Sequence, residues 1–366
     1  MTAETAPAIL EIDLDAIAEN WRLLSRRHPS GPVAAVVKAD AYGLGAEPVA
    51  AALYAAGCRH FFVAYLNEAL AIRAVVPDAM LAVLCGLISG AEDSFAAYNL
   101  TPVLGSLDEI RRWQDAARAI SGSSKPPAAI LHIDTGMARL GLSQYELEIL
   151  AREPDRLDSI AIRYTMTHLV SAEMPADGLN RLQRDRFAAA RAALPPAPAS
   201  LANSSGIFLG PDFRSDLARA GAALYGINPT PDRPNPMRSV VRLSVRVLAV
   251  RDIQVGTPVG YNATWIAARP SRIATAALGY ADGFHRSLSS RGAAYFDGTP
   301  VPLVGRVSMD LTTFDVTDHP AVQPGCWLEV LGRHLSPDDV AAAAGTNGYE
   351  VLTSLGRRFH RVYRTA

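Results

Sequence analysis

The chain has 366 residues, a formal net charge of −1 and an ordinary globular composition of 49% hydrophobic and 19% charged residues. This charge balance argues against nucleic acid or an anionic membrane as a partner. The first seven residues place no basic region ahead of an apolar stretch, and no later segment reaches the ~18 consecutive apolar residues of a membrane span. We therefore expect a soluble, cytoplasmic protein.

Residues 33–226 alternate short apolar runs with amphipathic stretches, a pattern typical of βα units whose strands are buried on both faces. The runs predict eight strands: Ala34–Ala39, Phe61–Tyr65, Leu81–Gly86, Thr101–Ser106, Ala128–Asp134, Ile160–His168, Ser200–Ser204 and Ala218–Tyr225. The expected helices include Leu14–Arg26, Glu47–Ala56, Asn67–Val75, Leu107–Ile120, Gln144–Arg152 and Leu179–Ala193, with only a turn or two in 205–216. This pattern predicts an α/β fold with a (β/α)8 barrel, and an open doubly wound sheet is the alternative.

A proline-dense stretch, Pro229–Pro236, marks a change of pattern. Short runs separated by turn residues follow it, and they predict mostly antiparallel strands. These runs are Leu243–Ala249, Arg272–Leu278, Val301–Val307, Thr312–Val316 and Trp327–Leu331. We therefore expect two domains, a barrel over 1–232 and a β domain over 233–366.

Reactive side chains end several predicted barrel strands, where barrel enzymes build their active sites. They are Lys38, Asp134, His168, Asn203 and Ser204, and Arg219 with Gly221 lies on the eighth predicted strand. Only two lysines occur among 35 basic residues, and Lys125 is expected in a solvent loop, whereas Lys38 follows a buried run. The three cysteines have no metal-ligand or disulfide spacing, so no metal site is expected.

A lysine desolvated in a barrel mouth loses proton affinity, and its neutral amine can form a Schiff base with an aldehyde. Small residues and a hydroxyl group after strands seven and eight suit a phosphate group. Together these features predict a barrel that binds pyridoxal phosphate.

The segment Ala35–Gly45, with Lys38 and Tyr42, resembles the cofactor-lysine motif of alanine racemases. Further motifs follow in family order: Asp134–Gly141, Thr167-His168, Ala202–Ser204, Arg219–Gly226, Gly260–Thr264, Gly279–Gly283, Val304–Asp310 and Tyr349–Thr353. The resemblance covers nearly the whole chain and independently implies a barrel followed by a β domain.

The resemblance implies a role for each matching residue. Lys38 would hold pyridoxal phosphate and act as one base, and Tyr261 of the other subunit would act as the second base. The phosphate would lie on Tyr42, Ser204 and the backbone at Gly221 and Ala222.

Two arginines complete the implied site. Arg219 would face the pyridine nitrogen, oriented by His168, and leave that nitrogen unprotonated, which weakens the electron sink and suppresses transamination. Arg139 and the backbone of Met309 would bind the substrate carboxylate. A head-to-tail homodimer with two shared active sites follows from the position of Tyr261.

Two positions depart from the family pattern. His132 stands where many members carry a carbamylated lysine, so we hypothesise that a bound anion such as chloride, or another carboxylate, balances Arg139. Arg357 stands where some members place a tyrosine on the phosphate or at the entrance, and we assign it no catalytic role.

The function that this resemblance implies is interconversion of L- and D-alanine by a two-base mechanism, which supplies D-alanine for peptidoglycan. A racemase for serine or for a broader set of amino acids is the alternative. A non-catalytic pyridoxal-phosphate carrier would not need the β domain, and a decarboxylase of this architecture would be expected to carry a carboxylate in place of Arg219.

Overall fold

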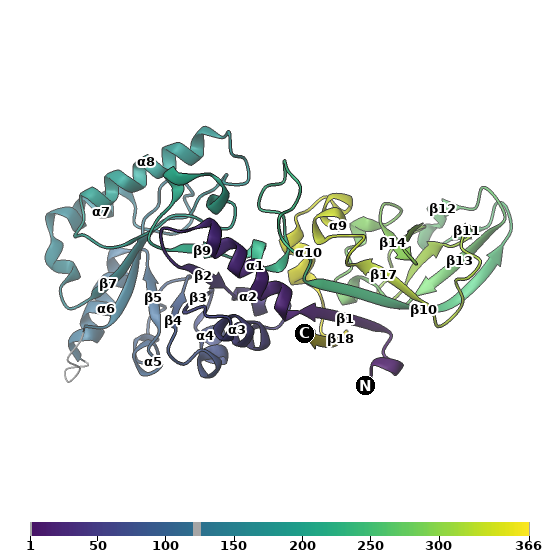
Figure 1. Ribbon diagram of the computed structural model, residues 1–366, viewed down its shortest axis with the longest axis horizontal. Helices are drawn as coiled ribbons and strands as arrows, with labels where there is room; N and C mark the ends of the chain where they lie inside the picture. Colours follow the sequence, from purple (N-terminus) through teal and green to yellow (C-terminus); the bar gives the residue numbers. More distant parts are fainter. Residues whose placement is uncertain (1, 120–125, 366) are drawn as a thin grey trace.

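The computed structural model describes residues 2–119 and 126–365, so Lys125 lies outside the described residues. The chain forms two lobes, a barrel surrounded by helices and a separate sheet (Figure 1). The proline-dense stretch 229–236 contains no helix or strand, as its composition predicts.

The first lobe is a parallel barrel. Its strands, in spatial order, are β8 (Ala199–Ser200), β7 (Ala161–Met166), β6 (Ala128–His132), β5 (Thr101–Leu104), β4 (Met80–Val83), β3 (His60–Val63), β2 (Val33–Val36) and β9 (Ala218–Ala220). Hydrogen bonds from Leu217 N to Ala199 O (3.0 Å) and from Arg219 N to Ala202 O (2.9 Å) connect the two ends of this order. The sheet therefore closes on itself, and the open doubly wound alternative is wrong.

Helices cover the outside of the barrel (Figure 1). They are α1 (Leu14–Arg27), α3 (Ala46–Ala55), α4 (Leu66–Ile72), α5 (Glu92–Ala97), α6 (Leu107–Ala119), α7 (Gln144–Arg152) and α8 (Gly178–Ala192). α5 was not among the helices named from the sequence. Between β8 and β9 only two 3-10 turns form, Gly206–Phe208 and Pro211–Phe213, which confirms the short connection expected there.

Side chains pointing to the barrel axis fill its interior, as the alternation of side chains along a strand requires. This interior group contains Ala34, Val36, Phe62, Ala82, Val103, Ile130, Met166 and Leu217, all buried. The neighbouring residues on the same strands, such as Ala35, Phe61 and Leu81, pack in a second core with the helices. The barrel is therefore solid below its mouth, and a ligand can enter only at the ends of the strands.

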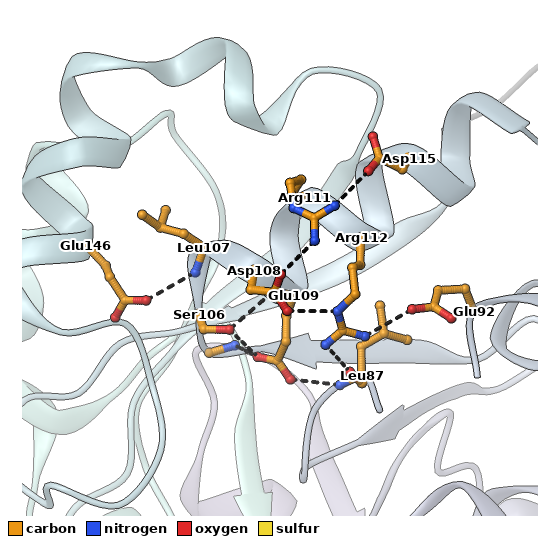
Figure 2. A network of polar contacts seen from close by, with 11 residues as sticks. Leu87, Glu92, Ser106, Leu107, Asp108, Glu109, Arg111, Arg112, Asp115 and Glu146 are labelled. Atoms are coloured by element: carbon orange, nitrogen blue, oxygen red, sulfur yellow. Dashed lines mark hydrogen bonds and ion pairs between the residues drawn. The ribbon is translucent and has the colours of Figure 1, made fainter. Parts of the chain in front are cut away.

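Three glutamates tie neighbouring loops together at the barrel mouth. Glu68, Glu109 and Glu146 each lie at the third position of a helix that follows a strand. Each accepts a backbone N–H from the loop after an earlier strand: Ala39 (2.6 Å), Leu87 (2.9 Å) and Leu107 (3.2 Å), respectively. Figure 2 shows the second and third of these contacts.

Arg112 strengthens the same part of the mouth (Figure 2). Its guanidinium contacts Glu92 of α5 at 3.0 Å, Asp108 at 3.0 Å and the carbonyl oxygen of Leu87 at 2.6 Å. The loop after β4 is thus held by both α5 and α6.

The second lobe is a mostly antiparallel sheet. Its strands are β10 (Val241–Ile253), β13 (Ser271–Ala276), β14 (Ala293–Phe296), β15 (Thr299–Pro302), β16 (Thr312–Asp315), β17 (Trp327–Leu331) and β18 (His360–Arg364), and a hairpin of β11 (Pro258–Val259) and β12 (Trp265–Ile266) lies beside it. The fold class expected from the sequence is confirmed: a barrel precedes a mostly antiparallel domain.

The first strand of the chain, β1 (Ala8–Asp13), belongs to this second sheet. It pairs antiparallel with β10, where Leu10 faces Leu243, and parallel with β18, where Ile9 faces His360. The domain limits expected from the sequence place these residues with the barrel, whereas their strand partners lie in the other lobe. The domain limits of 1–232 and 233–366 stay a prediction.

Two helices of the second lobe, α9 (Pro337–Ala344) and α10 (Gly348–Ser354), lie at the junction between the lobes (Figure 1). α10 packs against the short segment α2 (Lys38–Tyr42) of the barrel mouth. Within residues 2–119 and 126–365, no helix combines the length and apolarity required to cross a membrane.

Candidate active site

A cavity of about 220 Å³ opens at the carboxyl ends of the barrel strands. It brings together seven of the predicted site residues, namely Lys38, Tyr42, His168, Ser204, Arg219, Gly221 and Ala222. Val36, Leu84, Glu173, Asn203, Ser205 and Tyr349 complete its lining.

Lys38 follows β2, and its amine makes no hydrogen bond or ion pair with the described residues. Burial lowers the pKa of Lys38, and the positive charge of Arg139 lowers it further. Desolvation and a neighbouring cation are two conditions that raise the neutral, nucleophilic fraction of a lysine amine. Lys38 is therefore poised to react with an aldehyde.

The backbone after Lys38 is strained. Four residues in succession, 39–42, have φ between 52° and 56°, a left-handed conformation that costs about 1–2 kcal/mol for each residue other than glycine. Polar contacts hold this turn: Glu68 accepts the N–H of Ala39, and Asp40 accepts the N–H of Ala46 at 2.7 Å. The structure thus fixes the direction in which Lys38 leaves its strand.

Arg219 is buried and has no carboxylate partner among the described residues. Its guanidinium donates to Ser200 O (2.9 Å), Ser200 Oγ (2.7 Å) and Thr167 O (2.5 Å), and it lies 3.5 Å from His168 Nδ1. Burial lowers the pKa of Arg219 to about 10. The group remains a cation at neutral pH and can only donate hydrogen bonds.

His168 is the neutral neighbour of this cation. Burial and then the charge of Arg219 lower the pKa of His168 to about 3. A neutral ring whose Nδ1 accepts from Arg219 carries its proton on Nε2. His168 can therefore orient Arg219 without adding charge to the cavity.

Ser204 forms the centre of a candidate phosphate site. Its Oγ accepts the N–H groups of Gly221 (3.0 Å) and Ala223 (3.3 Å), so its own hydroxyl hydrogen is available to a ligand. Ala222 begins a 3-10 turn, Ala222–Tyr225, and its N–H has no acceptor within that turn.

Gly221 allows close approach at this point. A Cβ atom there would lie 2.5 Å from Tyr42 Oη, so a side chain would displace that hydroxyl group. The Tyr42 ring packs on Tyr225 with ring centroids 4.7 Å apart.

A reactive amine, a buried cation and clustered hydroxyl and amide donors in one cavity fit an aldehyde that also carries a phosphate group.

Arg139 lies on a loop shaped by Asp134. The Asp134 carboxylate accepts the N–H groups of Gly136 (2.9 Å), Met137 (2.9 Å) and Ala138 (3.1 Å), and these bonds lower its pKa. Asp134 is thus engaged with its own loop. Arg139 is exposed and makes no hydrogen bond or ion pair with any described residue.

His132 lies buried below this loop. Burial, followed by the charge of Arg219, lowers the pKa of His132 to about 4. The ring is therefore neutral at pH 7 and supplies no negative charge to Arg139. No carboxylate contacts Arg139 among the described residues, so the hypothesis of a balancing carboxylate has no candidate within that part of this chain.

Tyr261 and Met309 do not line the cavity of Lys38. Tyr261 is 66% exposed and Met309 is 55% exposed, and both belong to the second lobe. Tyr261 lies between β11 and β12, whose hairpin is at the end of the second lobe away from the barrel (Figure 1). One chain therefore does not bring these two residues to Lys38.

Three residues at the site had no role assigned from the sequence, although Tyr349 begins the last of the family motifs. Glu68 binds the backbone beside Lys38, and Glu173 and Tyr349 line the cavity. The spacing of Glu68 after the strand at Phe61 matches the third position of a helix, which was a usable signal. The family motif at Tyr349–Thr353 was a usable signal for Tyr349, whereas Glu173 reaches the cavity through tertiary packing that local sequence patterns do not encode.

Sequence profiles of two known domains match the chain: "Alanine racemase, N-terminal domain" over residues 12–229 and "Alanine racemase, C-terminal domain" over residues 240–363. Curated relatives include an alanine racemase of Acidiphilium cryptum, 55% identical over 97% of this chain and 98% of its own length. Another, an alanine racemase of Rhodospirillum rubrum, is 50% identical over 98% of this chain and 96% of its own length.

Solved structures give the same result. An alanine racemase from Bartonella henselae with covalently bound pyridoxal phosphate superposes with a TM-score of 0.94, at 42% identity over 98% of this chain and all of that chain. The biosynthetic alanine racemase of Pseudomonas aeruginosa superposes with a TM-score of 0.91, at 33% identity over 99% of this chain and all of that chain.

Proposed function

The chain belongs to the alanine racemase family, and we propose that it interconverts L- and D-alanine with Lys38 and Tyr261 of the partner subunit as its two bases. The observation that carries the proposal is the unpaired Lys38 amine in a cavity that also contains Arg219 and Ser204. The D-alanine product supplies peptidoglycan synthesis.

Pyridoxal phosphate is the cofactor, and when bound it withdraws electrons and thereby acidifies the α-hydrogen of the amino acid. We assign its covalent attachment to Lys38 and its phosphate to Tyr42, Ser204, Gly221 and Ala222. The free hydroxyl hydrogen of Ser204 and the unpaired N–H of Ala222 support this assignment.

Lys38 would move the proton on one face of the α-carbon. Its lowered pKa supports this role, because a larger neutral fraction of the amine can accept a proton at Nζ. Tyr261 of the partner subunit would move a proton at its Oη on the opposite face. The high exposure of Tyr261 in one chain supports a function at a subunit contact.

Arg219 would keep the pyridine nitrogen unprotonated, because a guanidinium with a pKa of about 10 donates at neutral pH and does not give up its proton. His168 would orient it. Arg139, with the backbone of Met309 of the partner subunit, would bind the substrate carboxylate, and the absence of a competing acid at Arg139 among the described residues supports this role.

These assignments require a head-to-tail homodimer in which each active site draws on both chains. They also fit a division into a cofactor domain over 1–232 and a β domain over 233–366. We propose a cytoplasmic location, supported by three cysteines that are all unpaired, as suits a reducing compartment.

The absorbance band of the bound cofactor and a racemisation assay with alanine, serine and lysine test the proposal together. Lys38→Ala should remove the covalently held cofactor and leave the fold intact. Faster turnover of serine than alanine would favour the alternative, a serine or broad-spectrum racemase, and a folded wild-type protein without a cofactor band would overturn the assignment of the site.

A further inference from the structure

Gln183, on α8, is a buried polar residue that the mechanism above does not use, with 1% of its surface exposed. Its Nε2 donates to Thr135 Oγ1 at 3.1 Å and to His168 O at 2.9 Å, and its Oε1 accepts the N–H of Val170 at 2.9 Å. A carbonyl oxygen can only accept and an N–H can only donate, so these partners fix the orientation of the amide.

The three bonds join the loops after two neighbouring barrel strands, β6 and β7. Thr135 belongs to loop 133–142 after β6, which also carries Arg139, whereas His168 and Val170 belong to the loop after β7. Breaking any of these bonds would leave a buried polar group unpaired, which is costly. Gln183 therefore fixes the two loops relative to each other.

The loop that carries Arg139 is closed on itself. The N–H of Asp134 donates to Leu142 O at 3.1 Å, and the N–H of Leu142 donates to His132 O at 2.7 Å, so the ends of the loop are paired. Inside the loop, the Asp134 carboxylate accepts three further N–H groups. The loop thus holds its own shape, and the place of Arg139 depends on how the loop is attached to the barrel.

Thr135 provides that attachment and is 3% exposed. Besides its bond to Gln183, its Oγ1 lies 2.8 Å from Thr167 Oγ1, and its carbonyl oxygen accepts from Arg186 of α8 at 3.2 Å. The Arg139 side chain makes no hydrogen bond or ion pair with the described residues. Its position therefore depends on contacts of Thr135, two of which come from α8.

Arg219 is held independently of Gln183. Its guanidinium donates to Ser200 and to the carbonyl oxygen of Thr167, and none of these bonds involves α8. Loss of the Gln183 amide would therefore release the loop of Arg139 and leave Arg219 in place.

We propose that Gln183 is a positioning residue, which sets the place of Arg139 relative to Arg219 at the mouth of the barrel. Gln183 does not line the cavity, so it acts on the substrate only through the loop of Arg139. The inference rests on the proposed function, in which Arg139 binds the substrate carboxylate. Small misplacements of such a group are costly because alignment of the substrate depends on it.

The test compares Gln183→Leu with Gln114→Leu. Gln114, on α6, is also buried, and its Nε2 donates to the carbonyl oxygens of Asp155 and Asp158, both at 3.0 Å, but it does not line the cavity. The measurements are KM and kcat for alanine, the cofactor absorbance band, and the calorimetric Kd of propionate, which has the carboxylate and methyl group of alanine but no amine.

We expect Gln183→Leu to raise KM and the propionate Kd about tenfold, with a smaller effect on kcat and an unchanged cofactor band. Gln114→Leu should lower the Tm comparably and leave the other measurements at wild-type values. Unchanged constants in folded Gln183→Leu, or equal changes in both variants, would overturn the proposal. Loss of the cofactor band in Gln183→Leu alone would also overturn it, because the effect would then lie at the cofactor.

A double mutant shows whether Gln183 acts through Arg139. Arg139→Gln gives the propionate Kd without the carboxylate contact, and adding Gln183→Leu to it should raise that Kd no further. Additive effects would refute the positioning role. Wild-type propionate binding in Arg139→Gln would instead refute the proposed role of Arg139 itself, which distinguishes that result from a failure at Gln183.

Thr135→Val keeps the test decisive if Gln183→Leu does not fold, because it removes only the hydroxyl group that Gln183 contacts. We expect it to raise KM and the propionate Kd about threefold, as for one lost hydrogen bond, and Thr135→Ser to restore both. Wild-type constants in Thr135→Val would overturn the proposal.

Discussion

The carboxylate of Glu68 accepts the backbone N–H of Ala39, the residue after Lys38, across 2.6 Å. Its other oxygen accepts the N–H groups of Ala64 (2.7 Å) and Tyr65 (3.1 Å) at the end of β3. Glu68 thereby joins the loops after two neighbouring strands. Glu146 does the same for the loops after β5 and β6, without contact to the cavity.

Glu68→Gln should weaken the hold on the strained turn and slow the capture of pyridoxal phosphate by the cofactor-free protein. The matched variant is Glu146→Gln, which loses an equivalent set of bonds. We expect both substitutions to lower the free energy of unfolding by about 1–3 kcal/mol, but only Glu68→Gln to slow cofactor capture. Thermal unfolding and the rate of the absorbance change measure the two effects. Equal slowing in both variants would show that Glu68 acts only through general stability.

Local patterns predicted the barrel strands because each buried strand leaves a short apolar run, as in Phe61–Val63. They did not predict that β1 pairs with β10, some 230 residues away, because such pairing depends on tertiary contacts and not on local periodicity. The left-handed turn at 39–42 contains no glycine and has no propensity signal, so only the surrounding contacts specify it.

The candidate site was predictable to the extent that strand ends converge in a barrel. Lys38, His168, Ser204 and Arg219 meet for that reason. Tyr349 begins a family motif, but it reaches the cavity because α10 of the second lobe packs on the turn after Lys38, and local periodicity does not predict that contact.

Arg219→Glu should lower the racemisation rate by about a hundredfold, because a carboxylate would favour the protonated form of the pyridine nitrogen. The stronger electron sink would stabilise the carbanion and slow the return of a proton to it. Pyruvate formed from alanine by transamination should rise at the same time. Arg219→Lys keeps the charge and serves as the comparison, with less pyruvate. A rate close to wild type in Arg219→Glu, with no new absorbance and no pyruvate, would contradict the electronic role.

Stability should fall as pH drops below about 6.5, because His132 and His168 have folded-state pKa values of about 4 and 3, below the ordinary 6.5. Between pH 6.5 and its folded-state pKa, each histidine binds more protons in the unfolded chain than in the folded chain. Each therefore makes the free energy of unfolding fall by about 1.4 kcal/mol per pH unit as the pH drops through that range. Above pH 6.5 this contribution is fully present. In His132→Asn, the free energy of unfolding, measured by chemical denaturation from pH 7 to pH 4, should fall less steeply than in the wild type. An unchanged slope would mean that His132 is already protonated in the folded protein.

Chloride should stabilise the protein if an anion balances Arg139, since His132 provides no negative charge there. We expect a higher Tm in chloride than in gluconate at equal ionic strength. The difference should vanish in Arg139→Gln and persist in Arg152→Gln, at an exposed arginine at the end of α7. The same Tm in both salts would exclude chloride as the counterion.

Racemisation requires proton transfer on both faces of the α-carbon, and Lys38 on a fixed turn serves one of them. Tyr261, 66% exposed and absent from the cavity of its own chain, must act on the cavity of a partner if it is the second base. Lys38→Ala and Tyr261→Phe homodimers should each be nearly inactive. After subunit exchange, a heterodimer contains one site with both native residues and one with neither, so a mixture should recover up to about a quarter of the wild-type activity, because random exchange makes about half of the dimers mixed. Exchange is verified with differently tagged chains. Demonstrated exchange without recovery would place both residues in the same chain's site or exclude Tyr261 as the base.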